Sequence, residues 1–167
     1  NFCIHYRYET QKAILTDIVA SLYAQGHRRL LIINGHGGNS FKNMIRDLSL
    51  DYPDFLIATS EWFTFVPAKE YFDEPGDHAD ELETSVMMHY HPELVDLSEA
   101  GDGKSKKFAS QMLNEKVAWI PRHWMKVSED TGIGNPKKAS AEKGKRYVEA
   151  VTAKYAQLFK ELTEEIY

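Results

Sequence analysis

The chain has 167 residues, of which 43% are hydrophobic and 27% are charged. This size is typical of one domain, and such a chain buries about 70% of its unfolded surface, so it needs no disulfide or metal to hold a core. The net charge of −5 argues against broad nucleic-acid binding. The single cysteine, Cys3, is typical of a reducing compartment, and the longest apolar run is too short to cross a membrane. We therefore expect one soluble, cytoplasmic domain over residues 1–167 that binds neither nucleic acid nor membranes.

Hydrophobic periodicity predicts alternating helices and strands in the first part of the chain. Helical spacing covers 9–25 and 40–51, and short apolar runs rich in β-branched residues cover 30–33 and 55–59. The first run is continuously apolar, which is typical of a strand in a parallel sheet that is covered on both faces. A strand, a helix and a strand in this order indicate an α/β layered domain.

The rest of the chain predicts a long aromatic loop and two more helices. Residues 61–77 are rich in aromatic and turn residues, so we expect a loop there, followed by a helix over 79–89. Residues 117–125 contain two tryptophans and a proline and suit a further strand. Apolar residues on one face predict a last helix over 140–164.

The strongest local signal for chemistry is the run Asn34-Gly35-His36-Gly37-Gly38-Asn39, directly after the first predicted strand. Ligands of open α/β sheets bind outside the carboxyl ends of the strands, and glycines allow a metal or ligand to approach closely. A neutral imidazole of His36 could bind Zn²⁺, Mn²⁺ or Fe²⁺. A tight turn whose histidine bonds only to the backbone explains the same residues equally well.

A second cluster, Asp77-His78-Ala79-Asp80-Glu81-Leu82-Glu83, combines an imidazole with several carboxylates just before an apolar helix. If that helix begins near Ala79, Asp80 and Glu83 share one face, and Glu83 could point at a cleft. Acidic residues in a first turn also complement the helix macrodipole, so capping alone explains part of the pattern. For this cluster in isolation the structural interpretation is the stronger one.

Other side chains give weaker signals. His123 lies between Arg122 and Trp124, and Trp62 lies beside Glu61, so either residue could line a pocket. Their aromatic neighbours are equally well explained by a hydrophobic core or an interface.

Three segments, taken in order, resemble the creatininase (creatinine amidohydrolase) family. They are the glycine-rich run 34–39, the run 78–85 after the aromatic loop, and Gly132-Ile133-Gly134-Asn135-Pro136 followed by Ala139 and Ala141-Glu142-Lys143-Gly144. The resemblance covers most of the chain. It implies an α/β fold with three layers, α/β/α, and a mostly parallel sheet. It also implies a site for two divalent transition metals, commonly Zn or Mn, with Fe in some members.

The resemblance implies roles for single residues. His36 corresponds to the histidine ligand of the glycine-rich loop, and Glu83 to a glutamate metal ligand of members with a Gly-Gly loop. His78 corresponds to a histidine of proton transfer near the substrate, which makes it the expected catalytic residue. The family takes further ligands from a segment upstream of the first helix, and we expect that segment before Asn1. Residues 1–167 would then form the C-terminal two-thirds of the family's domain.

Three further residues are expected to contact the substrate. We expect Trp62, Gly37 and Asp80 to bind the substrate, with the aromatic loop walling off bulk water. Creatininase itself has a glutamate ligand where this chain has Gly38, which argues against creatinine as the substrate. Asp80 stands where the family usually has glycine, which is expected to alter the pocket beside His78.

The resemblance implies a metal-dependent hydrolase that cleaves a C–N bond of a small cyclic or formyl amide with metal-activated water. The family also implies a small-molecule substrate and a homo-oligomer. Two alternatives stay open: hydrolysis of a keto-cyclitol of the inosose type at the same site, and a non-catalytic interaction or scaffold protein.

Overall fold

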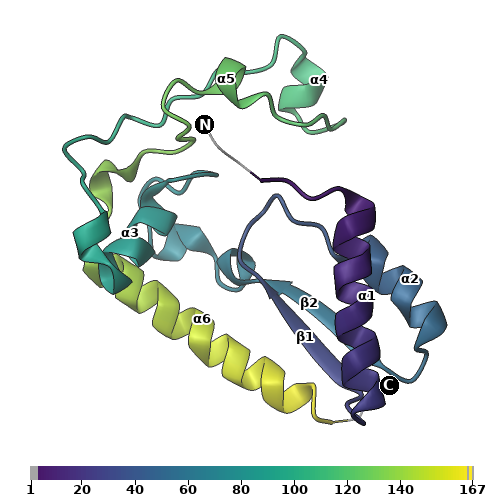
Figure 1. Cartoon of the computed structure of the whole chain (residues 1–167). Coiled ribbons are helices and arrows are strands. Elements are labelled where there is room, and N and C mark those ends of the chain that lie inside the picture. Colours follow the sequence, from purple (N-terminus) through teal and green to yellow (C-terminus); the bar gives the residue numbers. More distant parts are fainter. Residues whose placement is uncertain (1–3, 165, 167) are drawn as a thin grey trace. The chain divides into compact units, whose positions relative to one another are not determined.

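The computed structural model describes residues 4–164 and 166 (Figure 1), so Cys3 lies outside the described residues. The chain divides into two compact units. Unit 1 consists of the described residues up to Phe63 and those from Glu161 onward, and unit 2 consists of residues Thr64–Lys160. The expectation of one domain over residues 1–167 stays a prediction. Among the helices of the described residues, none combines the length and hydropathy that a membrane span requires.

Unit 1 is an α/β arrangement in which α1 (Tyr8–Ala24), β1 (Arg29–Asn34), α2 (Lys42–Asp51) and β2 (Leu56–Glu61) follow one another. The strands pair in parallel along their whole length (Figure 1), so their carboxyl ends meet at the same edge. The 3-10 helix η1 (Trp62–Thr64) begins directly after β2. These elements confirm the predicted alternation of helices and strands, with boundaries close to the expected ones.

The core of unit 1 lies on one face of the β1–β2 pair. Its buried side chains come from both helices and from the approach to β2: Leu15, Val19, Met44, Leu48 and Phe55. Leu30, Ile32 and Ile57 pack against this cluster, and the period of two along a strand places Leu30 and Ile32 on the same face. Burial of each large apolar side chain contributes about 1.5–3 kcal/mol, which fixes α1 and α2 on that face.

Unit 2 consists of helices joined by long loops. Its elements are η2 (Ala68–Glu70), α3 (Glu81–Tyr90), η3 (Pro92–Leu94), α4 (Gln111–Asn114), α5 (Trp124–Val127), η4 (Pro136–Lys138) and α6 (Ala141–Glu161). The strand predicted over 117–125 is wrong, because that stretch is irregular up to the start of α5. Val117 is 70% exposed and Trp119 is 83% exposed, so their side chains lack the half-buried surface that a strand offers.

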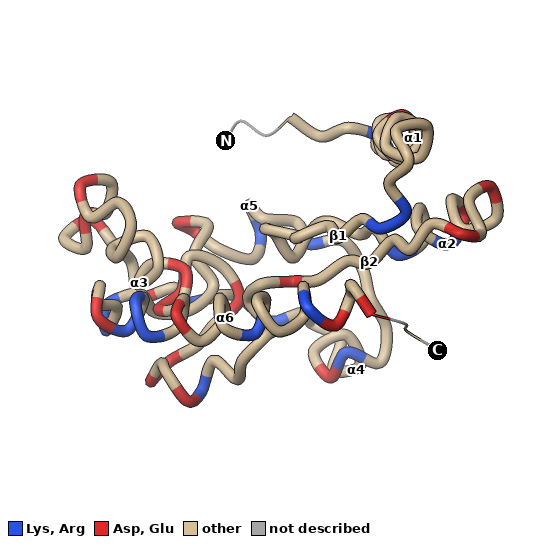
Figure 2. Tube along the Cα trace, turned by 90° about the horizontal axis from the view of Figure 1, so that it is seen from below, with Lys and Arg blue, Asp and Glu red and all other residues tan. Residues whose placement is uncertain are grey.

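The two long helices of unit 2 approach each other closely. A side chain at Gly144 of α6 would overlap the carbonyl group of Ser85 in α3, so glycine permits the approach. Tyr147 is fully buried one turn further along α6 and packs against Phe72 and Tyr71, with ring centroids 5.2 and 5.4 Å away. In Figure 2, Lys and Arg residues are interspersed with Asp and Glu residues around α3 and α6.

Candidate active site

The glycine-rich loop of unit 1 is folded around the side chain of Asn34, at the carboxyl end of β1. Asn34 is 3% exposed, and its Oδ1 accepts hydrogen bonds from the backbone N–H of His36 (3.2 Å) and the side-chain amide of Asn39 (3.0 Å). The backbone N–H of Asn39 also donates to the carbonyl of His36 (3.1 Å). Both ends of the loop are therefore tied to one buried amide, which places His36 at the edge of the sheet.

The ring of His36 is turned back onto its own loop. Its Nδ1 accepts a hydrogen bond from the backbone N–H of Gly38 at 3.0 Å. A Cβ at Gly38 would lie 3.0 Å from the same ring nitrogen, so this approach suits glycine. A neutral imidazole that accepts at Nδ1 carries its proton at Nε2. Coordination of a metal through either nitrogen therefore requires the contact with Gly38 to open.

Aromatic side chains lie beside the glycine-rich loop because β1 and β2 end at the same edge. The indole N–H of Trp62 donates to the carbonyl of Gly35 at 3.4 Å. Phe63 packs on Trp62 edge to face, with ring centroids 6.1 Å apart, and a Cβ at Gly37 would lie 3.6 Å from the Phe63 ring. The structure thus brings Trp62 to the loop that contains His36 and Gly37.

In unit 2, Asp80 is the N-cap of α3. Its Oδ1 accepts from the backbone N–H of Glu83 (2.9 Å), and its Oδ2 accepts from that of Gly76 (2.6 Å). The side chain is 5% exposed, and backbone donors engage both of its oxygens, as in a helix cap. The geometry shows capping, and a direct contact of Asp80 with substrate stays a prediction.

His78, in the loop before α3, lies next to Glu83 in the first turn of that helix. Glu83 Oε2 is 3.9 Å from His78 Nδ1 and accepts from the backbone N–H of Ala79 at 2.7 Å. Ala79 has a φ of +48°, a left-handed conformation that costs about 1–2 kcal/mol outside glycine. The backbone of His78 is held by Ile133, which accepts from its N–H (3.0 Å) and donates to its carbonyl (2.8 Å). Strained and clamped backbone of this kind is concentrated at functional sites.

A pocket of about 420 Å³ opens beside this pair, and Ala79 and Glu83 form part of its wall. Its lining comes entirely from unit 2 and is mainly apolar, with Met87, Leu94 and Val95 among the residues that close it. The acidic residues in the lining are Glu83, Asp96, Glu99 and Asp130, and the described lining residues include no Lys, Arg or His. The pocket therefore favours an uncharged or cationic molecule over an anion.

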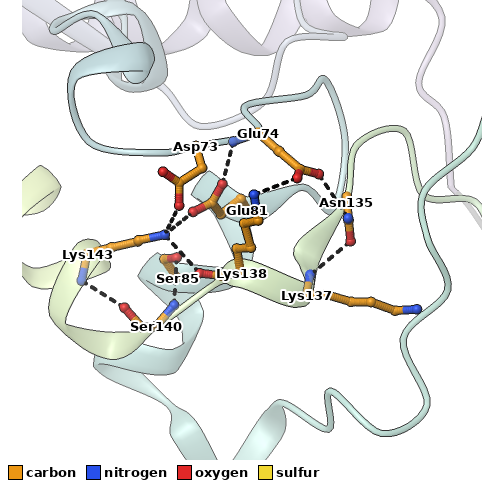
Figure 3. A network of polar contacts seen from close by, with 9 residues as sticks. All are labelled: Asp73, Glu74, Glu81, Ser85, Asn135, Lys137, Lys138, Ser140 and Lys143. Carbon is orange, nitrogen blue, oxygen red and sulfur yellow. Dashed lines mark hydrogen bonds and ion pairs between the residues drawn. The ribbon is translucent and has the colours of Figure 1, made fainter.

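A buried polar network supports the loop that contains His78 (Figure 3). Glu81 is fully buried; it forms an ion pair with Lys143 of α6, and its Oε2 accepts from the backbone N–H of Glu74 at 2.6 Å. Lys143 also donates to Asp73 (2.8 Å), and this bond, followed by the one to Glu81, raises the pKa of Lys143. Sequence reasoning missed the pairing of Lys143 with Glu81. The only hint was that both residues fall within the segments of the family resemblance.

The described residues supply candidate metal donors without completing a metal site. His36 lies in unit 1, and Glu83 lies in unit 2. Among residues 4–164 and 166, no group of three or more His, Cys, Asp or Glu side chains is arranged to hold a metal ion. A catalytic zinc usually takes three protein ligands, so the chemistry of His36 and Glu83 suits such a metal but their number does not.

Comparison with known proteins places these features in a family. The family model described as creatinine amidohydrolase, Creatininase, matches residues 1–159. A 3-dehydro-scyllo-inosose hydrolase of Thermotoga maritima is 25% identical over 173 residues, which cover 90% of this chain and 55% of the relative. A creatinine amidohydrolase of Pseudomonas putida is 26% identical over 168 residues, which cover 91% of this chain and 62% of the relative. The chain thus spans less than two-thirds of the length of these relatives.

Solved structures show the same fold. The crystal structure of a candidate creatinine amidohydrolase from Bacteroides fragilis NCTC 9343 is 64% identical, with a TM-score of 0.95 over 99% of this chain and 66% of that one. A Zn–Zn type of a mutant creatininase and a Mn form of creatininase are each 25% identical, with TM-scores of 0.76 over 95% of this chain and 65% of theirs. The likeness confirms the predicted creatininase-like α/β fold. Together with the family match over nearly the whole sequence, it shows that the chain belongs to the creatininase family.

Proposed function

We propose that the protein containing this chain is a metal-dependent hydrolase that cleaves a C–N bond of a small cyclic or formyl amide. The observation that carries the proposal is the pairing of His78 with Glu83, 3.9 Å apart, next to a pocket of about 420 Å³. A carboxylate in the wall of such a pocket, with an imidazole next to that carboxylate, suits acid–base chemistry on a small molecule. The acidic, otherwise apolar lining favours a neutral or cationic substrate.

We assign His36 and Glu83 as ligands of divalent transition metals, because imidazole nitrogen and carboxylate oxygen both suit Zn, Mn and Fe. The Zn–Zn and Mn forms of creatininase among the related structures support this assignment. Bound metals of this kind supply a water of lowered pKa and polarise a carbonyl group. The remaining ligands are proposed to come from residues other than those described.

The residues of this chain have distinct proposed roles. His78 passes a proton to the leaving nitrogen, and the hydrogen bonds between its backbone and Ile133 hold the main chain that carries the imidazole. Trp62 excludes bulk water beside the glycine-rich loop, and Gly37 leaves room for the substrate. Asp80 acts on the substrate side by holding the loop at Gly76 against the first turn of α3.

One observation favours a second candidate, hydrolysis of a keto-cyclitol at the same site. The Thermotoga maritima relative, which matches 90% of this chain, is a 3-dehydro-scyllo-inosose hydrolase. A panel of cyclic and formyl amides assayed beside cyclitol ketones separates the two reactions. A homo-oligomeric state and a cytoplasmic location stay predictions.

The first test is the metal content of the full-length protein, measured by elemental analysis together with the intact mass. We expect close to two transition-metal ions per chain. Glu83→Gln should lower metal affinity and turnover together, whereas His78→Ala should lower turnover and leave the metal bound. A protein that stays free of metal after incubation with Zn²⁺ and Mn²⁺ would instead support the non-catalytic interaction protein.

A further inference from the structure

The imidazole of His78 lies against the indole of Trp124, the first residue of α5. The ring centroids are 4.9 Å apart, and the ring planes are inclined by 57°. Both residues belong to unit 2, and Trp124 is partly buried whereas its neighbour Met125 is 72% exposed. An aromatic pair at this separation is stabilising beyond the area that it buries.

A second contact holds the indole in place from the side of Arg122. The guanidinium carbon of Arg122 lies 4.8 Å from the centroid of the Trp124 ring, within the range of a cation–π interaction. The same guanidinium forms a hydrogen-bonded ion pair with Asp77. Asp77 directly precedes His78, so two neighbouring residues of one loop contact two nearby residues of another segment. We call Asp77, His78, Arg122 and Trp124 the tryptophan clasp.

The clasp constrains a degree of freedom that the backbone contacts of His78 do not. The bridge to Ile133 fixes the main chain of His78, whereas the direction of its ring depends on contacts of the side chain. The separation of 3.9 Å from Glu83 exceeds that of a hydrogen bond, so this pair does not fix the direction of the ring. The indole of Trp124, whose centroid lies 4.9 Å from that of the imidazole, limits the rotation of the imidazole by excluded volume.

Simple burial of an apolar side chain explains the contact less well. Trp119 belongs to the same segment and is 83% exposed, so the segment does not bury its tryptophans in general. A helix as short as α5 is not stable by itself, and the clasp is one of the contacts that order it. Of these two tryptophans, Trp124 is the one that packs against His78, while Trp119 faces solvent.

We propose that Trp124 is a positioning residue for His78, and that the Arg122–Asp77 ion pair holds the indole in register. The inference rests on the proposed function insofar as His78 transfers a proton. A displacement of about 1 Å at a reacting group costs on the order of 100-fold in rate. We expect Trp124→Ala to lower kcat by about that factor with KM nearly unchanged, while Trp124→Phe keeps a flat ring and most of the turnover.

The contact itself is tested without any substrate. In the full-length, isotope-labelled protein, the ring current of Trp124 shifts the Cε1–H resonance of His78, which the His78→Ala variant identifies. Trp124→Ala should move this resonance towards the position of a histidine without an aromatic neighbour, Trp124→Phe should retain part of the shift, and the control Trp119→Ala should leave it unchanged. An unaltered His78 resonance in Trp124→Ala would overturn the inference.

Kinetics then decide whether the contact positions the ring for catalysis. Trp124→Ala and Arg122→Ala should both lower kcat, and Arg122→Ala combined with Asp77→Asn should cost less than the sum of the single changes. Equal kcat values for Trp124→Ala and Trp119→Ala would overturn the positioning role, as would a loss confined to KM. If Trp124→Ala fails to fold, Arg122→Ala carries the same test. Absence of turnover in the wild type, with the resonance shift intact, contradicts only the proposed function.

Discussion

Lys143 of α6 forms an ion pair with the fully buried carboxylate of Glu81 in the first turn of α3 (Figure 3). The same ammonium group donates to Asp73 at 2.8 Å and to the carbonyl of Lys138 at 3.0 Å. One side chain therefore ties together the loop before His78, the start of α3 and the turn before α6. The two segments of the family resemblance that contain Glu81 and Lys143 form a single packing unit around this pair.

Replacement of Lys143 by Met should destabilise the protein strongly. It would leave the carboxylate of Glu81 buried without its cation, which typically costs about 3–5 kcal/mol. Lys145 is exposed on the same helix, so Lys145→Met is the matched control and should change stability little. Urea unfolding of both variants measures the difference. Equal midpoints for the two variants would mean that the pair contributes nothing to stability.

Replacement of Gly144 by Ala should also destabilise, against the usual sign for a helix. In an exposed helix interior, alanine is more stable than glycine by about 0.8–1 kcal/mol. At Gly144 the new methyl group would overlap the carbonyl of Ser85, and separation of α3 from α6 costs about 1–3 kcal/mol. Thermal unfolding compared with Lys145→Ala measures the effect. A rise in the melting temperature would show that the helices part at little cost.

Stability should fall at alkaline pH because of Tyr147. Burial, with a smaller contribution from the nearby charge of Asp80, raises the pKa of Tyr147 to about 12. Between pH 10 and 12 the unfolded chain releases this proton while the folded protein retains it, so the free energy of unfolding decreases as the pH rises. Two pKa units correspond to about 3 kcal/mol. The raised pKa of Lys143 acts in the same direction.

Tyr147→Phe tests this dependence directly, because phenylalanine fills the same space without a proton to lose. The free energy of unfolding of this variant should decrease less steeply between pH 10 and 12 than that of the wild type. Tyr8 is 42% exposed, so Tyr8→Phe is the control and should follow the wild type. A Tyr147→Phe curve parallel to the wild type would assign the alkaline loss to other groups.

Local patterns were enough to predict unit 1 and part of the site. The alternation of β-branched runs with helical spacing predicted β1 and β2 because each pattern is contained within one element. That His78 and Glu83 lie close together could also be expected from the sequence, since they are near each other along the chain. The spacing of three residues between Asp80 and Glu83 is typical of a helix cap and so indicated the capping role of Asp80, although we had expected a substrate contact.

Contacts between segments that are distant in the chain could not be predicted from the sequence. Trp124 reaches His78, and Lys143 reaches Glu81, across long stretches of chain whose packing no local period encodes. The strand predicted over 117–125 was wrong for a related reason. Aromatic residues such as Trp119 favour a strand only where their side chains pack on the surface of a sheet. The further ligands of the proposed metal site would likewise come from parts of the protein that no local pattern connects to His36 and Glu83.

Asn34→Ala should weaken the proposed metal site from outside it. The change removes the acceptor that holds the backbone of His36 and the amide of Asn39, and unsatisfied buried donors cost about 1–3 kcal/mol. Loss of an outer partner of a ligand typically lowers metal affinity by about 10–100-fold. Competition with a chromogenic zinc chelator measures this affinity on the full-length protein. Asn43→Ala is the control, because Asn43 is exposed on α2 and accepts a hydrogen bond from the exposed side chain of Arg46. Wild-type affinity in Asn34→Ala, with the expected loss of stability, would mean that the glycine-rich loop does not hold the metal through His36.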